Sequence, residues 1–233
     1  MRFSQNLFIN CWLFIFGSCL GSFFTLLIDR WLTQREVVYT RSACEFCQTP
    51  LAYYDLCPVV GYLQQHGHCR YCDNDIPSHS LTAELLGGLS CCWLWQVHFW
   101  LQPVDIWLLF WLYLAALLDY RTQFVYQGIL TTMVVGSMVL TLPYSKIQLI
   151  TGLIFGLLLF VLQHWHHGLG EADLVWLLVL LFSHNFTWLL EIILISNLLV
   201  VIHQQLLRKA HGPIPYLPYL FVSYLLLPLG QLF

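Results

Sequence analysis

Two acidic segments far apart in the chain carry carboxylates beside long apolar runs. Asp173 closes GLGEAD (168–173) and precedes LVWLLVLLF, while Asp119 ends the apolar run of LYLAALLDYRTQ. Two carboxylates held close together cannot both ionise cheaply, so one stays protonated while the other acts as a base. Such a pair can activate a water molecule and protonate a carbonyl oxygen. Asp119 and Asp173 are therefore the candidate catalytic residues.

Each of these acids also has an interpretation without chemistry. An acid such as Asp173 in the first turn of a helix interacts favourably with the helix dipole. Asp119 lies at the opposite, C-terminal end of its apolar run, where a carboxylate is unfavourable. This mismatch makes Asp119 the stronger evidence for function. Gly168 and Gly170, just before Asp173, would let the backbone approach a peptide substrate closely.

Four cysteines form two CxxC pairs in one polar stretch. Cys44 and Cys47 make the first pair and Cys69 and Cys72 the second, with 21 residues between the pairs. Each CxxC turn can direct two thiolates at one ion, and two turns complete a tetrahedral zinc site. Disulfide bonding is the alternative, and a reducing cytoplasm disfavours it. We therefore expect a structural Zn²⁺ bound by the four cysteines.

The elements that position these residues are expected to be membrane helices. Of the 233 residues, 59% are hydrophobic and only 9% are charged, whereas soluble domains have about 25% charged residues. The formal net charge is −3, and no basic block indicates binding to nucleic acid. The first apolar stretch is longer than a signal-peptide core and lacks a clear cleavage site, so it should be a retained span.

The hydrophobic pattern predicts an all-α polytopic membrane protein with about eight transmembrane helices. A spanning helix needs roughly 20 mainly apolar residues. The candidate spans are 6–28, 80–101, 104–118, 124–142, 147–163, 173–184, 187–206 and 214–232. The expected organisation is a first transmembrane helix at 1–29, a cytosolic zinc-binding loop at 30–79, and a core of about seven helices at 80–233.

The basic residues predict the orientation of these spans in the plasma membrane. With both termini outside, seven basic residues fall on the cytoplasmic side and only Arg2 and Lys146 fall outside. The seven are Arg30, Arg35, Arg41, Arg70, Arg121, Arg208 and Lys209. Asp119 and Asp173 then share the cytoplasmic boundary, as acid–base chemistry by two groups requires.

Taken in order, these residues resemble the type IV prepilin peptidase family, the aspartic membrane proteases that process type IV pilins and pseudopilins. The similar segments cover nearly the whole chain. They are GSCLGSFFTLLIDRW (17–31), the two CxxC turns that flank PLAYYDLCPVVGYLQQHGHCRYC, IPSHSLTAELLGG (76–88), DYRTQFVYQGILT (119–131) and GLGEAD (168–173).

The resemblance implies a substrate, site residues and a second activity. It implies that the leader of a prepilin or pseudopilin precursor is cut after a glycine, just before an apolar segment. Asp119 and Asp173 match the catalytic aspartates, and Glu84 matches the family's glutamate position. Glu171 is a candidate contact for the basic leader, with a solvated loop acid as the alternative. Many members also N-methylate the new N-terminus with S-adenosylmethionine, and the small size is similar to that of competence-type members.

The chain departs from the family pattern at both aspartate segments. The second motif has Ala172 where the family has glycine, and Val175 where it has lysine. The first motif has Tyr126-Gln127 in place of a Pro-Asp pair, so Asp119 is the only acid of that segment. Substrate positioning and the second activity are the properties that these changes would affect.

Two other classes of function remain open on the sequence alone. A proton-coupled transporter would use the same intramembrane acids, but it does not explain the paired CxxC turns, and no internal repeat is visible. A membrane thiol oxidoreductase would use the CxxC pairs, but it would need them on the oxidising side, against the distribution of basic residues.

Overall fold

The computed structural model of the protein describes residues 2–36, 41–97, 102–142, 144–166, 170–207 and 214–230. In these ranges the regular secondary structure is helical, and the only β-type pairings are two isolated bridges in the cysteine loop. The chain forms two compact units, Met1–His98 and Phe99–Phe233. The expected all-α class is confirmed, whereas the division at residues 29 and 79 stays a prediction.

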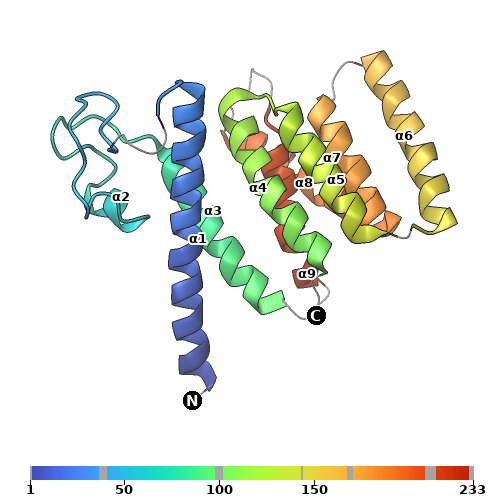
Figure 1. Cartoon of the computed structure of the whole chain (residues 1–233), viewed down its shortest axis with the longest axis horizontal. Helices are drawn as coiled ribbons and strands as arrows, with labels where there is room; N and C mark the ends of the chain where they lie inside the picture. The colour runs from blue at the N-terminus through green and yellow to red at the C-terminus, as the bar shows by residue number, and fades with distance from the viewer. Residues whose placement is uncertain are drawn as a thin grey trace. The chain divides into compact units, whose positions relative to one another are not determined.

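Unit 1 is a helical hairpin with an irregular loop. Helices α1 (Arg2–Leu32) and α3 (Ser78–Val97) pack along each other, and the loop between them holds the single-turn helix α2 (Val60–Gln64) (Figure 1). Small residues bring the two long helices together: a Cβ added to Gly17 would lie 2.2 Å from the Gly87 carbonyl oxygen. Close approach at small residues is a common way for helices to associate in membranes.

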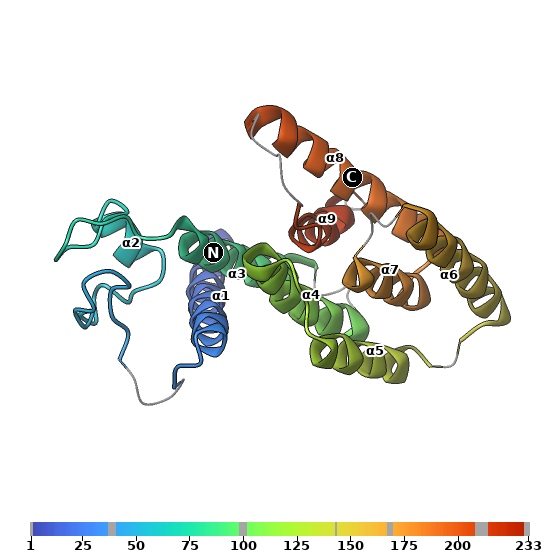
Figure 2. The same ribbon diagram turned by 90° about the horizontal axis from the view of Figure 1, so that it is seen from above.

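The described residues of unit 2 form six helices, and five of these helices form a closed ring. Contacts run from α4 to α5, α7, α8 and α9 and back to α4, and α6 packs on the outside of α7 (Figure 2). The helices are α4 (Pro103–Thr122), α5 (Gln127–Thr141), α6 (Lys146–His166), α7 (Glu171–Ser183), α8 (Phe186–Leu207) and α9 (Leu217–Gly230).

The core of unit 2 contains the short helix α7. Trp176 and Leu180 on α7 are completely buried, as are Leu108 and Leu112 on α4. In contrast, α6 exposes most of its apolar side chains, including Leu153 at 73%. A helix that is apolar on its outward surface is typical of a lipid-facing position, which agrees with the membrane location expected from the composition.

Each of the eight predicted spans corresponds to a helix of the structure, within a few residues at the described ends. Among the described residues, four helices are long and apolar enough to cross a membrane by themselves, namely α1 (Leu7–Leu32), α4, α6 and α8. Helices α5 and α9 are apolar but shorter. The full count of eight spans and their orientation stay predictions.

Candidate functional site

Asp119 lies one turn before the end of α4 and contacts the start of α9. The backbone N–H of Leu217, the first residue of α9, donates a hydrogen bond to Asp119 Oδ2 at 3.1 Å. The α4 helix ends just beyond, where Gln123 adopts a left-handed conformation and its N–H bonds back to the Asp119 carbonyl. The carboxylate therefore lies at the positive end of α9, which offsets its unfavourable position at the end of α4.

Asp173 is the third residue of α7 and folds back onto the residue that precedes the helix. Gly170 is the N-cap of α7, and its backbone N–H is a hydrogen-bond donor to the Asp173 carboxylate. A Cβ at Gly170 would lie 3.1 Å from Asp173 Oδ2, closer than most Cβ contacts. Gly170 thus leaves room for this carboxylate, which gives the glycine a local structural role.

The structure brings the two aspartates of α4 and α7 into electrostatic range of each other, since their negative charges interact. Both carboxylates lie at the N-terminus of a helix, Asp119 at α9 and Asp173 at α7. Because two like charges at this range repel each other, the pair is more stable with one acid protonated, and the helix N-termini stabilise the ionised member. The arrangement can therefore supply one acid and one base at the same place.

Tyr216, immediately before α9, joins the same neighbourhood. Its hydroxyl oxygen is 2.5 Å from Ser196 Oγ on α8, and the same oxygen is in electrostatic range of Asp173. Because the Ser196 hydroxyl already donates to the Ile193 carbonyl at 3.0 Å, Tyr216 is the donor in this pair. Tyr216 and Ser196 were not predicted from the sequence, because a hydroxyl in an apolar segment is too common a signal to identify them.

The other residues predicted around Asp173 are only partly described. Gly168 lies outside the described residues. Glu171 is the first residue of α7, and its side chain is exposed to solvent. An exposed acid in this position is compatible both with a contact to a basic peptide and with simple solvation.

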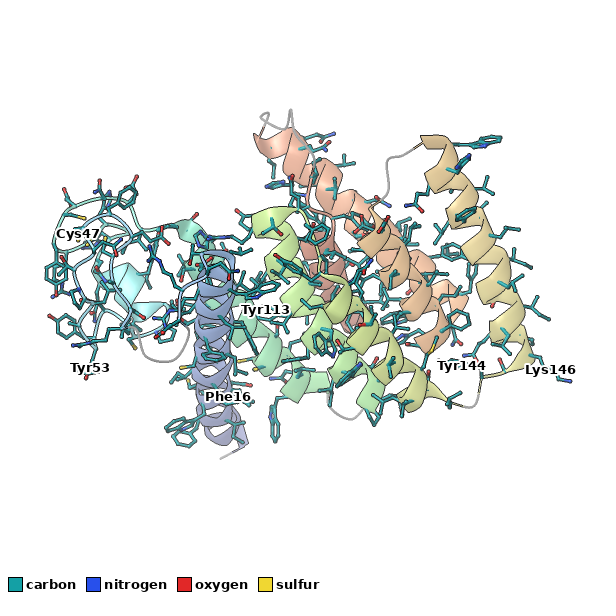
Figure 3. All side chains as sticks on the ribbon, turned by 45° about the horizontal axis from the view of Figure 1, so that its top comes forward. Phe16, Cys47, Tyr53, Tyr113, Tyr144 and Lys146 are labelled. Carbon is teal, nitrogen blue, oxygen red and sulfur yellow. The ribbon has the colours of Figure 1, made fainter. Side chains whose placement is uncertain are left out.

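The four predicted zinc ligands come together in the loop of unit 1, where Figure 3 labels Cys47. The Sγ atoms of Cys44, Cys47, Cys69 and Cys72 all lie within 4.8 Å of one another, and those of Cys44 and Cys72 are 3.8 Å apart. Four sulfur ligands at about 2.3 Å from a tetrahedral ion are about 3.8 Å from each other. The four thiols therefore fit a metal ion, and the nine cysteines of the chain are all free thiols.

The two CxxC turns have the same local geometry. In the first turn the Cys44 N–H bonds to the Thr49 carbonyl, and in the second the Cys69 N–H bonds to the Asn74 carbonyl. The residue after each second cysteine has a positive φ, 57° at Gln48 and 59° at Asp73. Each turn thus folds its two sulfurs to the same side, and this local repeat explains why spacing alone predicted the cluster.

The thiols of the cluster are inequivalent electrostatically. Burial raises the pKa of the Cys44 thiol to about 11. Hydrogen bonds to Thr49 lower the pKa of Cys47 to about 6, and the Tyr71 backbone N–H lowers the pKa of Cys69. Each turn therefore contains one thiol that ionises readily, and the thiolate is the form that binds metals.

Glu84, on α3, has contacts that stabilise the loop. Its carboxylate accepts hydrogen bonds from the Val59 backbone N–H at 2.7 Å and from the Ser80 hydroxyl at 3.4 Å, and the residue is only 7% exposed. Val59 is the N-cap of α2 and has a positive φ of 62°. Glu84 also borders a cavity of about 230 Å³ between α1, the cysteine loop and the start of α3. These contacts give Glu84 a structural role, and a role in substrate binding stays a prediction.

Comparison with known proteins identifies relatives of both units. Residues 15–98 match the family described as the Bacterial Peptidase A24 N-terminal domain, and this range ends at the last residue of unit 1. The Type 4 prepilin-like proteins leader peptide-processing enzyme of Escherichia coli is 27% identical over 197 residues, which cover 76% of this chain and 71% of that protein.

Two further relatives match a shorter part of the chain. The Prepilin leader peptidase/N-methyltransferase of Myxococcus xanthus is 36% identical over 77 residues, 33% of this chain and 23% of that protein. The protein with the same description from Bacillus subtilis is 36% identical over 74 residues, 32% of this chain and 30% of that protein. No solved structure matches the chain. With the cysteine cluster and the helical fold, these matches support the resemblance of the chain to the type IV prepilin peptidase family.

Proposed function

We propose that this protein is a membrane aspartic endopeptidase that removes the short basic leader of type IV prepilins or pseudopilins. The observation that carries the proposal is the pairing of Asp119 and Asp173, whose charges interact although they come from different helices. Similarity to the prepilin peptidases supports the substrate class, because the relatives are described as prepilin leader peptidases.

In the proposed mechanism the two carboxylates share one proton. The ionised aspartate takes a proton from a water molecule, which then attacks the carbonyl carbon of the scissile peptide bond. The protonated aspartate donates its proton to the carbonyl oxygen and so stabilises the tetrahedral intermediate. Collapse of the intermediate returns a proton to the leaving amine. The pair titrates as a unit, so the two roles belong to the pair rather than to a fixed residue.

The contacts of each carboxylate support a preorganised site. The Leu217 N–H holds Asp119 through one oxygen, and the Gly170 N–H holds Asp173. A carboxylate that is fixed before the substrate arrives needs little reorganisation during the reaction. Gly170, Gly168 and Glu171 are proposed to border the bound peptide, and Glu171 is proposed to contact the basic leader.

The four cysteines are proposed to bind a structural Zn²⁺. Bound to Cys44, Cys47, Cys69 and Cys72, the ion would cross-link the two CxxC turns of a loop that has little hydrophobic core of its own. No step of the peptide cleavage is assigned to it. Because the four thiols cluster around one point, a structural metal site accounts for them better than a thiol oxidoreductase does.

The active site is proposed to face the cytoplasm, with both termini of the chain outside. Seven of the nine basic residues would then lie on the cytoplasmic side, as the positive-inside rule requires. A site at this boundary meets a leader that is still inside the cell, joined to a helix that rests in the plasma membrane.

A second activity, N-methylation of the new N-terminus, is supported by the descriptions of the relatives as leader peptidase/N-methyltransferases. S-adenosylmethionine would be the methyl donor, and we assign no residue to it. Incubation of the cleaved product with labelled donor tests this activity separately, since methyl transfer does not require a second round of cleavage.

Purified protein in lipid vesicles, incubated with a prepilin-like precursor, tests the proposal as a whole. The expected result is a product whose N-terminus lies at the start of the apolar segment, identified by mass spectrometry. Proton flux across the vesicle membrane without proteolysis would support the transporter instead and would contradict the proposed peptidase function.

A further inference from the structure

A second polar cluster joins three helices of unit 2 at the end remote from Asp119. It centres on Asp105, in the first turn of α4, whose Oδ1 accepts hydrogen bonds from His184 Nε2 at 2.7 Å and from the Tyr224 hydroxyl at 2.8 Å. Its Oδ2 accepts the Gln102 backbone N–H at 2.6 Å. Asp105 is 7% exposed and Tyr224 only 1%, so the cluster is buried inside the unit.

Aromatic packing fixes the imidazole of this cluster. His184 caps the C-terminus of α7 through a backbone hydrogen bond to the Leu180 carbonyl at 3.0 Å. Its ring stacks on Trp188 with centroids 3.8 Å apart and planes 9° apart. The Tyr224 ring stands nearly perpendicular to Trp188 at 4.9 Å. The imidazole therefore has one orientation, with Nε2 directed at Asp105.

The cluster connects the same helices that form the candidate active site. Asp105 and Asp119 are both on α4, His184 follows the helix that carries Asp173, and Tyr224 is on the helix whose first N–H binds Asp119. At 1.5 Å per residue, Asp105 is about 21 Å along α4 from Asp119, and His184 is about 16 Å from Asp173. Helices α4 and α9 are thus joined by hydrogen bonds at two separate levels, and at the second level the Asp173 charge on α7 is in electrostatic range of Asp119 and Tyr216.

Apolar side chains could hold these helices together at a smaller desolvation free energy than an ionisable cluster requires. A buried polar cluster differs from apolar packing in that its groups are satisfied in only one arrangement of the helices. A slide of any one helix would leave Asp105, His184 or Tyr224 without its partner. The cluster therefore specifies the register of α4, α7 and α9 rather than merely their association.

We propose that Asp105, His184 and Tyr224 are positioning residues that set the register of α4, α7 and α9 and thereby the separation of Asp119 and Asp173. The importance of that separation for cleavage rests on the proposed function, whereas the control of register does not. The experiment therefore measures hydrogen exchange of the backbone near Asp119, which does not depend on catalytic activity.

Hydrogen exchange measured by mass spectrometry on the full-length protein in lipid nanodiscs provides this test. The readout is the peptide containing Leu217, whose N–H is bound by Asp119. With Asp105→Ala and His184→Gln, exchange in this peptide and at the start of α7 should rise about tenfold. Asp105→Asn, which retains an acceptor for His184 and Tyr224, should restore most of the protection. Ser145→Ala, which removes a hydrogen bond to the Gln148 N–H at the start of α6, is the matched control and should leave the Leu217 peptide unchanged.

Faster exchange confined to residues 102–107 and 184–189 would overturn the proposal, because it would show a purely local role. If the alanine variant does not fold, Tyr224→Phe removes a single hydroxyl and should raise Leu217 exchange by a few-fold. In the cleavage assay the same variants should lower kcat while KM stays within about twofold. An inactive wild-type protein would contradict the proposed function. The hydrogen-exchange result would still show whether Asp105, His184 and Tyr224 set the helix register.

Discussion

Asp119 Oδ2 accepts the backbone N–H of Leu217 at 3.1 Å, across 98 positions of the chain. This single contact joins the C-terminal end of α4 to the N-terminal end of α9. It gives Asp119 a structural role in addition to the proposed chemical one, since the carboxylate stabilises the start of α9. Experiments on Asp119 must therefore separate the loss of this hydrogen bond from the loss of an acid.

Replacement of one cluster cysteine should release the metal. Cys69→Ser removes a ligand that is 4% exposed, and a site with three thiolates binds Zn²⁺ far less tightly. Elemental analysis should give about one zinc per wild-type chain and near zero for the variant. Cys57→Ser is the matched control, because Cys57 is exposed in the same loop and outside the cluster. Full zinc content in Cys69→Ser would contradict the four-cysteine site.

The contact between α1 and α3 should not tolerate a methyl group at Gly17. Its Cβ would lie 2.2 Å from the Gly87 carbonyl oxygen, which belongs to a helix backbone and cannot rotate away. We expect Gly17→Ala to lower the free energy of unfolding by about 1–3 kcal/mol, measured by denaturation in detergent. Gly128→Ala has no atom within 4 Å of its new Cβ and should change stability by less than about 0.5 kcal/mol. Equal stability of the two variants would show that the helices are not in close contact at Gly17.

The Tyr216 hydroxyl should matter for cleavage more than for stability. Tyr216→Phe removes the donor to Ser196, a contact worth roughly 1 kcal/mol, and it removes a hydroxyl in electrostatic range of Asp173. We expect kcat to fall about tenfold or more while the melting temperature falls only slightly. Tyr219→Phe is the control, because it removes a similar hydrogen bond to His203 Nδ1 at 2.7 Å. If both variants lose activity equally, the Tyr216 hydroxyl has no specific role in cleavage.

The fold and the metal cluster were predictable because their signals are local. Apolar runs define the helices, and a CxxC turn contains within six residues the hydrogen bonds that orient both sulfurs. The short helix α2 was not predicted, since its start depends on Glu84, 25 positions away from the Val59 N–H.

The contacts around the aspartates could not be predicted, because they are tertiary. The sequence shows Asp119 at the wrong end of a helix, but not that the start of α9 compensates for it. Asp105 has the sequence pattern of an ordinary first-turn acid after Pro103. Only the folded chain brings it to His184, 79 positions away, and to Tyr224, 119 positions away. Helix periodicity carries no information about such pairs.

The cleavage rate of Asp→Asn variants shows whether Asp119 and Asp173 act as a catalytic pair. Asparagine retains an oxygen that can accept the Leu217 N–H, so Asp119→Asn should keep the start of α9 intact. With the purified protein in vesicles and a prepilin-like precursor, Asp119→Asn and Asp173→Asn should each lower kcat by about a thousandfold or more. The double variant should be no slower than either single one, because the two residues act as a unit.

Glu191→Gln, the same change at an exposed acid of α8, should stay within about twofold of the wild type. Zinc content and helical circular dichroism should match the wild type in all four proteins. A catalytic pair predicts that both aspartate variants lose cleavage while Glu191→Gln retains it. Cleavage above a tenth of the wild-type rate in either folded aspartate variant would contradict it.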